Sequence, residues 1–480
     1  MDNLKQRTVK GVAWKLSQTL ATKGLTFFFA MFMTRLLSPE DYGLIGMLSV
    51  FIMISTVFID CGFGQALIRK QKSTYEDNCT VFYFNLLSSS LCYILLFILS
   101  PFVAEFYNMP ILKDLLRIYG LSLIIGALYS IQVILYSKSL DFKTPTLVGL
   151  ISNIFSGFIG IFMAYNEFGV WSLVGQQISY GIIQALIFFN ISKWKPKFVF
   201  SLTSFKEMFA FGSKLLGANL LDVVYNQISP IFIGKYYSAS KLGLFSKSEQ
   251  LASFPCNTVY STLSSVTMPV LSKIQEDRIR MSSSYRKFIC LTSYVLFPFM
   301  IMLSIFSKDF LVTFFGNKWS GASIYLSIMC IPWMLVPLHN LNINLLAVKG
   351  RSDLILRLGF IVKGVGFSIL CITIPISVTA VCIGYTITTY SCYFVNTYYT
   401  AKFIDYPLKR QLADIIKPAI ISIVVGIIAY IISSFFIVSM IRLFIGFIVG
   451  ICLYAIVTYL LKFNEISEIK NIIINMRLKK

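Results

Sequence analysis

The stretch Leu44–Ala66, LIGMLSVFIMISTVFIDCGFGQA, contains a single charged side chain, Asp60. A helix that crosses the hydrocarbon of a bilayer needs about 20 mostly apolar residues, and stretches of this kind recur along the 480-residue chain. Of all residues 56% are hydrophobic and 13% are charged, and the charged share of a soluble protein is about twice as large. The sequence therefore predicts an all-α polytopic membrane protein. Its apolar runs are continuous rather than alternating, which excludes a transmembrane β-barrel.

The apolar stretches predict about fourteen transmembrane helices. The expected spans are 11–36, 44–66, 79–104, 114–137, 144–165, 170–190, 205–232, 243–270, 285–307, 321–348, 353–375, 378–404, 413–435 and 438–461. The segments between them are short, which leaves no room for a soluble catalytic domain on either side of the membrane. This absence weighs against most enzymes and favours a transporter.

The distribution of basic residues supports this count of helices. The net charge is +21, from 42 Lys and Arg against 21 Asp and Glu. With these spans, 28 basic residues fall on the side of the N-terminus and 6 on the opposite side. Cytoplasmic loops of membrane proteins are enriched in Lys and Arg, so both termini are predicted to be cytoplasmic. The positive charge is explained in this way without a nucleic-acid partner.

A weak internal repeat relates the two halves of the chain. Trp14–Ser17 aligns with Ser213–Leu216, and, with one inserted residue, Gly43 aligns with Gly243. This spacing predicts two six-helix bundles, related by an axis along the membrane normal, and two additional helices. The expected domains are residues 1–200, residues 201–406, and residues 407–480, which include a basic cytoplasmic tail.

Charged residues inside the expected spans are the candidate site residues. A charge at the centre of a bilayer costs about 2.5–3.5 kcal/mol, so such side chains usually face an internal cavity. Near the ends of helices, a long basic side chain can instead reach the headgroups, and Arg35, Arg117 and Arg357 remain open to that interpretation. The candidates for substrate binding are Lys15, Lys23, Lys214, Lys247, Lys363, Asp222 and Glu249.

Polar side chains at helical spacing accompany these charges. Thr22 and Thr26 continue a stripe that begins at Lys15, and Asn153 and Ser156 lie on a later span. Each of these side chains can simply form hydrogen bonds between packed helices. Together, the stripes on both halves predict a polar cavity, and the excess of Lys predicts that its cargo is anionic. A proton-relay role for His339, the only histidine, stays open.

The sequence contains none of the common motifs for catalysis or cofactor binding. We find no GxxxxGK[ST] loop, no HExxH and no GxSxG. The ten cysteines form no CxxC pair and are interpreted as small apolar residues. We therefore expect no cofactor, no metal and no ATP-driven step in this chain.

Two segments resemble a known family. Thr34–Leu44 (TRLLSPEDYGL) and Asp60–Leu67 (DCGFGQAL) are similar to segments of the Wzx-type polysaccharide flippases, the O-antigen, colanic acid and teichuronic acid exporters of the MATE-like MOP superfamily. Lys349–Asp353 (KGRSD) is similar to a loop of the same family. In these motifs Pro39 and Gly43 are expected to turn the chain, and the glycines after Asp60 are expected to permit close helix approach.

The resemblance implies a cargo and a location. It implies an undecaprenyl-diphosphate-linked oligosaccharide, moved from the inner to the outer leaflet of the bacterial inner membrane. It allows for a polysaccharide polymerase and chain-length machinery as partners, besides membrane lipids. A multidrug or organic-ion antiporter of the same superfamily is the alternative, but it would favour acidic residues in the cavity. A polysaccharide polymerase or ligase would need a large external loop, and a channel would need a selectivity filter.

Overall fold

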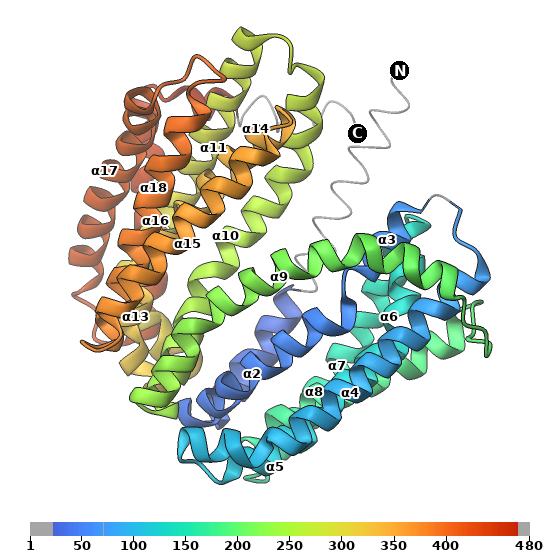
Figure 1. Ribbon diagram of the computed structural model, residues 1–480. Helices are drawn as coiled ribbons and strands as arrows, with labels where there is room; N and C mark the ends of the chain where they lie inside the picture. The colour runs from blue at the N-terminus through green and yellow to red at the C-terminus, as the bar shows by residue number, and fades with distance from the viewer. Residues whose placement is uncertain (1–22, 71, 469–480) are drawn as a thin grey trace. The chain divides into compact units, whose positions relative to one another are not determined.

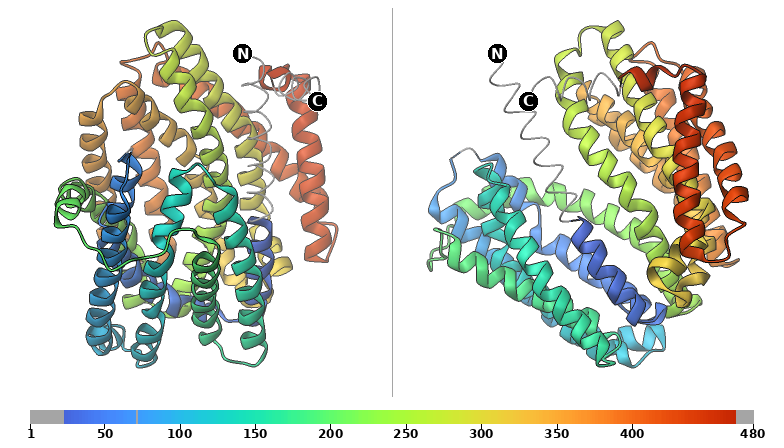
Figure 2. Two further views of the ribbon diagram at one scale, coloured as in Figure 1. Left: turned by 90° about the vertical axis from the view of Figure 1, so that its right-hand side faces the viewer. Right: turned by 180° about the vertical axis from the view of Figure 1, so that it is seen from behind.

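The computed structural model describes residues 23–70 and 72–468, and every regular element within these ranges is a helix. The chain forms two compact units, residues 1–243 (unit 1) and residues 244–480 (unit 2), and Figures 1 and 2 trace the helices of each. The domain boundaries expected from the repeat, at 200 and 406, stay predictions.

Unit 1 begins, in its described part, with a helix over residues 23–36. It continues with α2 (Pro39–Asp60), α3 (Phe63–Arg69), α4 (Tyr75–Tyr107), α5 (Ile111–Tyr119), α6 (Leu121–Lys138), α7 (Lys143–Tyr165), α8 (Trp171–Ile191), α9 (Leu202–Tyr236) and the first residues of α10 (Ala239–Lys273). Helices α7 and α8 pack side by side, α4 packs on α6, and α2 contacts both α4 and α9 (Figure 1).

In its described part, unit 2 contains the remainder of α10 and a further series of helices. They are α11 (Arg278–Ile305), α12 (Ser307–Phe315), the 3-10 helix η1 (Asn317–Ala322), α13 (Ser323–Trp333), α14 (Val336–Val348), α15 (Ser352–Thr373), α16 (Val378–Thr400), α17 (Leu408–Ser433) and α18 (Ser439–Leu460). Helix α17 packs against α11 and α18, and α16 packs against α13, α14 and α15.

Local sequence sets where several helices begin. Ser38 and Asp41 form a capping box at the start of α2, and Thr74 and Asp77 form another at the start of α4. In such a box each side chain accepts a hydrogen bond from a backbone N–H that the helix leaves unpaired. Pro39 is the first residue of α2, where its missing N–H and fixed φ are tolerated.

The predicted span 44–66 is interrupted in the structure. Cys61 and Gly62 adopt left-handed backbone conformations, with φ of 42° and 71°, and separate α2 from α3. A Cβ on Gly62 would lie 2.9 Å from the Cα of Gly212 in α9, so this turn is also a close helix contact. The sequence-based role for Gly43 as a turn is wrong, because Gly43 lies inside α2 and instead lets the backbone of α10 approach.

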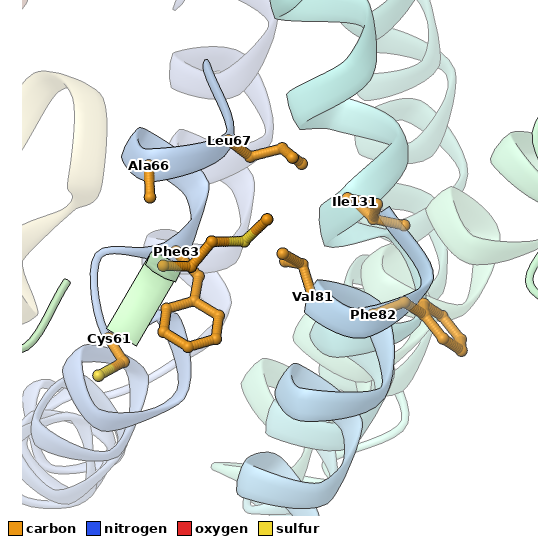
Figure 3. Packing of buried hydrophobic residues seen from close by; sticks show 8 residues of the cluster. Cys61, Phe63, Ala66, Leu67, Val81, Phe82 and Ile131 are labelled. Carbon is orange, nitrogen blue, oxygen red and sulfur yellow. The ribbon is translucent and has the colours of Figure 1, made fainter. Parts of the chain in front are cut away.

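Buried apolar residues hold α3 against its neighbours in unit 1. Phe63, Leu67, Val81 and Ile131 have essentially no exposed surface, and Figure 3 shows their side chains converging from α3, α4 and α6. The Phe63 ring also stacks on Phe84 at a centroid distance of 4.2 Å. Each such buried side chain contributes roughly 1.5–3 kcal/mol of transfer free energy, and the cluster therefore fixes the short helix α3.

Other large apolar side chains point away from the packed interior. On α4, Leu87, Leu91 and Ile98 are each about 60% exposed, a pattern that suits a helix surrounded by lipid. In the described ranges, eleven helical segments are long and apolar enough to cross a membrane. The prediction of an all-α, multi-span membrane protein is confirmed, while the total of fourteen spans stays a prediction.

The expected spans at 205–232 and 243–270 correspond to α9 and α10, which are not among these eleven segments. Both helices have 35 residues, so their length is sufficient. Both contain charged residues, among them Lys214 and Asp222 on α9 and Lys247 and Glu249 on α10. These helices therefore carry most of the candidate site residues.

Candidate functional site

The first candidate cation of unit 1 lies on the helix of residues 23–36. Lys23 is exposed at the beginning of the described part of that helix, whereas Lys15 lies outside the described residues. One turn after Lys23, Thr26 accepts a hydrogen bond of 2.7 Å from the side-chain amide of Asn153 on α7. Phe29 packs edge-on against Phe158 of the same helix. Two of the predicted polar stripes therefore meet, and they fix the helix that presents Lys23.

Two further candidates lie on α9. Lys214 and Asp222 are both exposed, and they stand eight residues apart on this helix. Asp222 lines an open hollow of about 400 Å³ between α2 and α9, together with Asp60 and Asn219. None of the side chains that line this hollow is basic. Unit 1 thus presents separate basic and acidic positions rather than one uniformly cationic surface.

Unit 2 contains the other candidates. The side chain of Lys247 on α10 is buried, with 4% of its surface exposed, and its ammonium nitrogen lies 5.1 Å from the centre of the Phe315 ring on α12. The hydroxyl of the adjacent Ser248 donates to the carbonyl oxygen of Ala322 at 3.0 Å. Lys247 therefore faces the packed interior of unit 2. The sequence-based prediction placed it in an open cavity and did not reveal this burial.

Glu249 and Lys363 are half-buried, on α10 and α15. Glu249 is two residues from Lys247, and successive helical positions point about 100° apart, so the two side chains face different directions. Within unit 1 the structure brings together Asp222 and Asp60, and within unit 2 it separates Lys247 from the exposed surface. Roles in cargo binding for all seven candidates stay predictions.

A buried polar network that sequence analysis missed occupies the interior of unit 2. The amide oxygen of Asn342 on α14 accepts hydrogen bonds of 2.7 Å from Tyr285 on α11 and from Thr400 on α16. The amide nitrogen of Asn342 donates to Thr397 at 3.3 Å. All four residues are fully buried. Buried polar groups are costly unless paired, and mutual pairing makes this network a specific junction of three helices.

The only histidine lies next to this network. His339 Nδ1 is 2.7 Å from the side-chain amide nitrogen of Asn396, which is fully buried on α16. The oxygen of the same amide has no hydrogen-bond partner in the described structure. Polar residues around His339 were visible in the sequence, but no linear pattern connects them with Tyr285, Thr397 or Thr400. The proton-relay role of His339 stays a prediction.

A second polar junction lies in unit 1, where α3 ends. Lys70 forms ion pairs with Asp77 of α4 at 3.1 Å and with Glu207 of α9 at 2.9 Å. The hydrogen bond to Glu207 is the main reason why the pKa of Lys70 lies above its ordinary value. Lys138 of α6 donates to the carbonyl oxygen of Leu67 and to the hydroxyl of Ser73. These contacts hold four helices of unit 1 together at their polar ends.

The described residues contain no group of three or more His, Cys, Asp and Glu side chains that could hold a metal ion. The chemistry available at the candidate positions is therefore charge and hydrogen bonding from Lys, Asp, Glu, Asn and Thr side chains. Such groups can bind and orient a charged cargo.

Comparison with known proteins gives a family and a fold. The model of a family described as polysaccharide biosynthesis protein matches residues 32–324. The teichuronic acid biosynthesis protein TuaB of Bacillus subtilis is 27% identical over 79% of each chain. The succinoglycan biosynthesis transport protein ExoT of Rhizobium meliloti is 24% identical over 67% of this chain and 65% of its own. The lipopolysaccharide biosynthesis protein WzxC of Escherichia coli is 21% identical over 73% of this chain and 72% of its own.

Solved structures agree on the fold. The lipid II flippase MurJ in an inward closed conformation has a TM-score of 0.73, with 18% identity, over 93% of this chain and 99% of its own. An inward-facing multidrug resistance MATE transporter of the MOP superfamily has a TM-score of 0.59, with 12% identity, over 79% of this chain and 94% of its own. The MATE-like fold predicted from the sequence motifs is thus confirmed.

Proposed function

Because the chain belongs to the polysaccharide biosynthesis protein family, whose model matches more than half of its length, we propose that it moves an undecaprenyl-diphosphate-linked oligosaccharide from the inner to the outer leaflet. The predictions that the chain belongs with the Wzx-type proteins and is a transporter, not an enzyme, are confirmed by its relatives and by its fold. The finer proposal adds the lipid-linked cargo, the direction of movement and alternating access. It places the protein in the bacterial inner membrane with both termini cytoplasmic.

The family match is the observation that carries this proposal, and the exposed lysines of unit 1 supply its chemistry. Lys23 and Lys214 are exposed on helices that are expected to cross the membrane. An ammonium group that faced hydrocarbon there would cost several kcal/mol, so a cavity with water or polar cargo is the favourable environment. In a low-dielectric surrounding, a cation also attracts a diphosphate far more strongly than it does in water.

The candidates divide between direct and indirect roles. Lys23 and Lys214 bind the diphosphate as point charges, and Lys363 and Lys15 add to the positive field. Lys247 lies under the Phe315 ring and contributes to this field without touching the cargo. Asp222 and Glu249 accept hydrogen bonds from sugar hydroxyls. A polysaccharide polymerase and chain-length machinery receive the product outside.

Single neutralising substitutions test the proposal. Purified protein is reconstituted into vesicles, and the translocation of a lipid-linked oligosaccharide is followed by its accessibility to a glycosidase added outside. Lys23→Gln and Lys214→Gln are expected to abolish translocation, and Lys→Arg at either position is expected to retain part of it. Lys206→Gln is the matched control, because Lys206 is also exposed on α9, eight residues before Lys214. Normal translocation by both Gln variants would contradict the site assignment.

A second candidate function, the antiport of organic cations, is favoured by the hollow that contains Asp60 and Asp222. Two carboxylates in one open hollow attract cations, and the fold is shared with a multidrug transporter. Dye uptake by vesicles that contain the wild type or Asp222→Asn separates the two functions. If antiport is correct, the wild type takes up an organic cation dye and Asp222→Asn lowers that uptake to the level of empty vesicles. If flipping is correct, neither protein takes up more dye than empty vesicles do.

A further inference from the structure

Unit 2 contains a polar pocket that none of the candidate cargo residues lines. It has a volume of about 330 Å³ and is bounded by α11, by α17 and by the residues that follow α18. Helices α11, α17 and α18 pack against one another, and Figure 2 shows α18 running beside α17. The pocket is therefore formed by packed helices within a single unit, rather than by an isolated loop.

Four basic side chains line this pocket, and two of them are already neutralised. Arg286 forms a two-pronged ion pair with Asp414, at 2.7 and 2.9 Å, and the Tyr406 hydroxyl donates to the same carboxylate at 2.6 Å. Lys287 pairs with Glu468 at 2.9 Å. These pairs fix the walls of the pocket, because each one joins different segments of the chain.

The other two basic side chains, Lys417 and Lys462, also line the pocket. Both are exposed, and neither forms an ion pair with any residue in the described part of the chain. The remaining carboxylate, Glu465, lies beside the Cys290 thiol. The pocket thus carries four basic and three acidic groups, a surplus of one positive charge, and Lys417 and Lys462 are its two basic groups outside these ion pairs.

The surface next to these two lysines is apolar and exposed. Tyr459, Leu460 and Leu461 directly precede Lys462, and they are 72%, 70% and 58% exposed. On α17 the neighbours Ile416 and Ile420 of Lys417 are also exposed. In a spanning helix such side chains face lipid chains. A ligand that occupies the pocket and also covers this surface needs an anionic head and apolar tails.

From this arrangement we propose that the pocket binds the phosphate headgroup of an anionic phospholipid, with Lys417 and Lys462 as the phosphate contacts. The acyl chains extend along the apolar residues of α17 and α18. Basic pockets between transmembrane helices bind anionic headgroups in this way, and each Lys near the membrane surface contributes about 1 kcal/mol. The site is independent of the transported cargo, because none of the candidate cargo residues lines it.

The test measures lipid binding rather than transport. Native mass spectrometry of the full-length protein, released from nanodiscs that contain equal amounts of phosphatidylglycerol and phosphatidylcholine, counts the lipids that remain bound. The wild type is expected to retain phosphatidylglycerol selectively. The double variant Lys417→Gln/Lys462→Gln is expected to lose about thirty-fold in affinity for it.

Two matched variants keep the test decisive. Lys409→Gln/Arg410→Gln removes the same charge from exposed residues of α17 that do not line the pocket, and it is expected to bind like the wild type. Lys417→Arg/Lys462→Arg keeps the charge and is expected to retain binding, which separates charge from folding. Equal retention of both lipids by the wild type, or equal loss in the control variant, would overturn the proposal. Displacement of the lipid by millimolar glycerol phosphate would show that the site accepts a soluble phosphate, and would overturn the assignment to lipid.

Discussion

Gly43 and Gly243 occupy equivalent positions of the internal repeat, and their backbones lie in direct contact. A Cβ placed on Gly243 would lie 3.0 Å from the backbone nitrogen of Gly43 and would overlap the carbonyl oxygen of Pro39. A Cβ on Gly43 would overlap the carbonyl oxygen of Ala239 in the same manner. Pro39 and Ala239 are themselves separated by the repeat offset that relates the two glycines. The contact is therefore reciprocal.

The helix starts on either side repeat the same cap. The hydroxyl of Ser38 accepts a hydrogen bond from the backbone N–H of Asp41 at 3.3 Å, and that of Ser238 accepts one from the N–H of Lys241 at 3.1 Å. Residues at the same offset thus perform the same task at the starts of α2 and α10. This equivalence supports the predicted repeat at these two helix starts, whereas the symmetry axis of the halves stays a prediction.

Replacing either glycine with alanine is expected to destabilise the protein. The added methyl group meets main-chain atoms, which cannot move aside as the end of a side chain can, so the cost should be at or above about 1–3 kcal/mol, the usual cost of overpacking. The melting temperature of the purified protein in detergent measures it. Gly126→Ala is the control, because a Cβ at Gly126 has no neighbour within 4 Å, and alanine is favoured in a helix. Unchanged melting of both Gly43→Ala and Gly243→Ala would contradict the contact.

Lys138→Met is expected to loosen the end of α3. The ammonium group of Lys138 donates to the carbonyl oxygens of Leu67 and Lys70 and to the hydroxyl of Ser73. Hydrogen bonds from a charged donor contribute about 1.5–3 kcal/mol, and Met keeps the length of the side chain without the charge. Hydrogen exchange of the backbone amides in 63–70 should accelerate. The exposed Lys143, which begins α7, provides the control Lys143→Met, which should leave this exchange unchanged.

Local features of the fold were predictable, and long-range ones were not. Ser38, Pro39 and Asp41 lie within four residues, so the start of α2 follows from sequence alone. The break at Gly62 depends on the approach of Gly212 from α9, which no local pattern shows. The same is true of the candidate site. The sequence showed a charged residue inside a span at Lys247, but the burial of this side chain depends on the ring of Phe315, which lies far along the chain.

Arg278→Cys tests the predicted topology. Cytoplasmic loops are enriched in basic residues, and Arg278 lies in such a segment and is exposed. In a background without the ten native cysteines, this cysteine should react with an impermeant maleimide only after the cells are permeabilised. Lys113→Cys, at an exposed position predicted to lie outside, should react in intact cells. Rapid labelling at position 278 from outside would reverse the assignment.

Asp141 gives a pH dependence with a defined sign. Its carboxylate accepts hydrogen bonds from the Thr144 hydroxyl at 2.7 Å and from the backbone N–H groups of Thr144 and Lys143. These bonds, that from Thr144 most of all, lower its pKa in the folded state. The stabilisation is complete above the unfolded pKa of about 3.9 and is lost as the pH falls through the lower, folded value.

The difference in melting temperature between the wild type and Asp141→Asn should therefore be constant near neutral pH and should shrink below about pH 4. Thr144→Val removes the strongest of the three bonds and should reproduce part of the same pH-dependent loss. A difference that grew as the pH fell would mean that the protonated, rather than the ionised, carboxyl group stabilises the folded protein.

Two substitutions in the buried network around Asn342 are expected to lower the stability of the protein by different amounts. Tyr285→Phe removes one donor, but Asn342 still accepts from Thr400, so the cost should be about 0.5–1.5 kcal/mol. Asn342→Leu instead removes all three bonds and leaves the buried Tyr285 hydroxyl unpaired, at a cost of about 1–3 kcal/mol, while Thr400 still donates to the carbonyl oxygen of Thr397 at 3.1 Å. The melting temperature should therefore fall further for Asn342→Leu than for Tyr285→Phe. In the double variant, Tyr285→Phe should instead recover part of the loss, because it removes the hydroxyl that Asn342→Leu leaves unpaired. Additive effects in this cycle would show that Tyr285 and Asn342 contribute independently and that the network is not a unit.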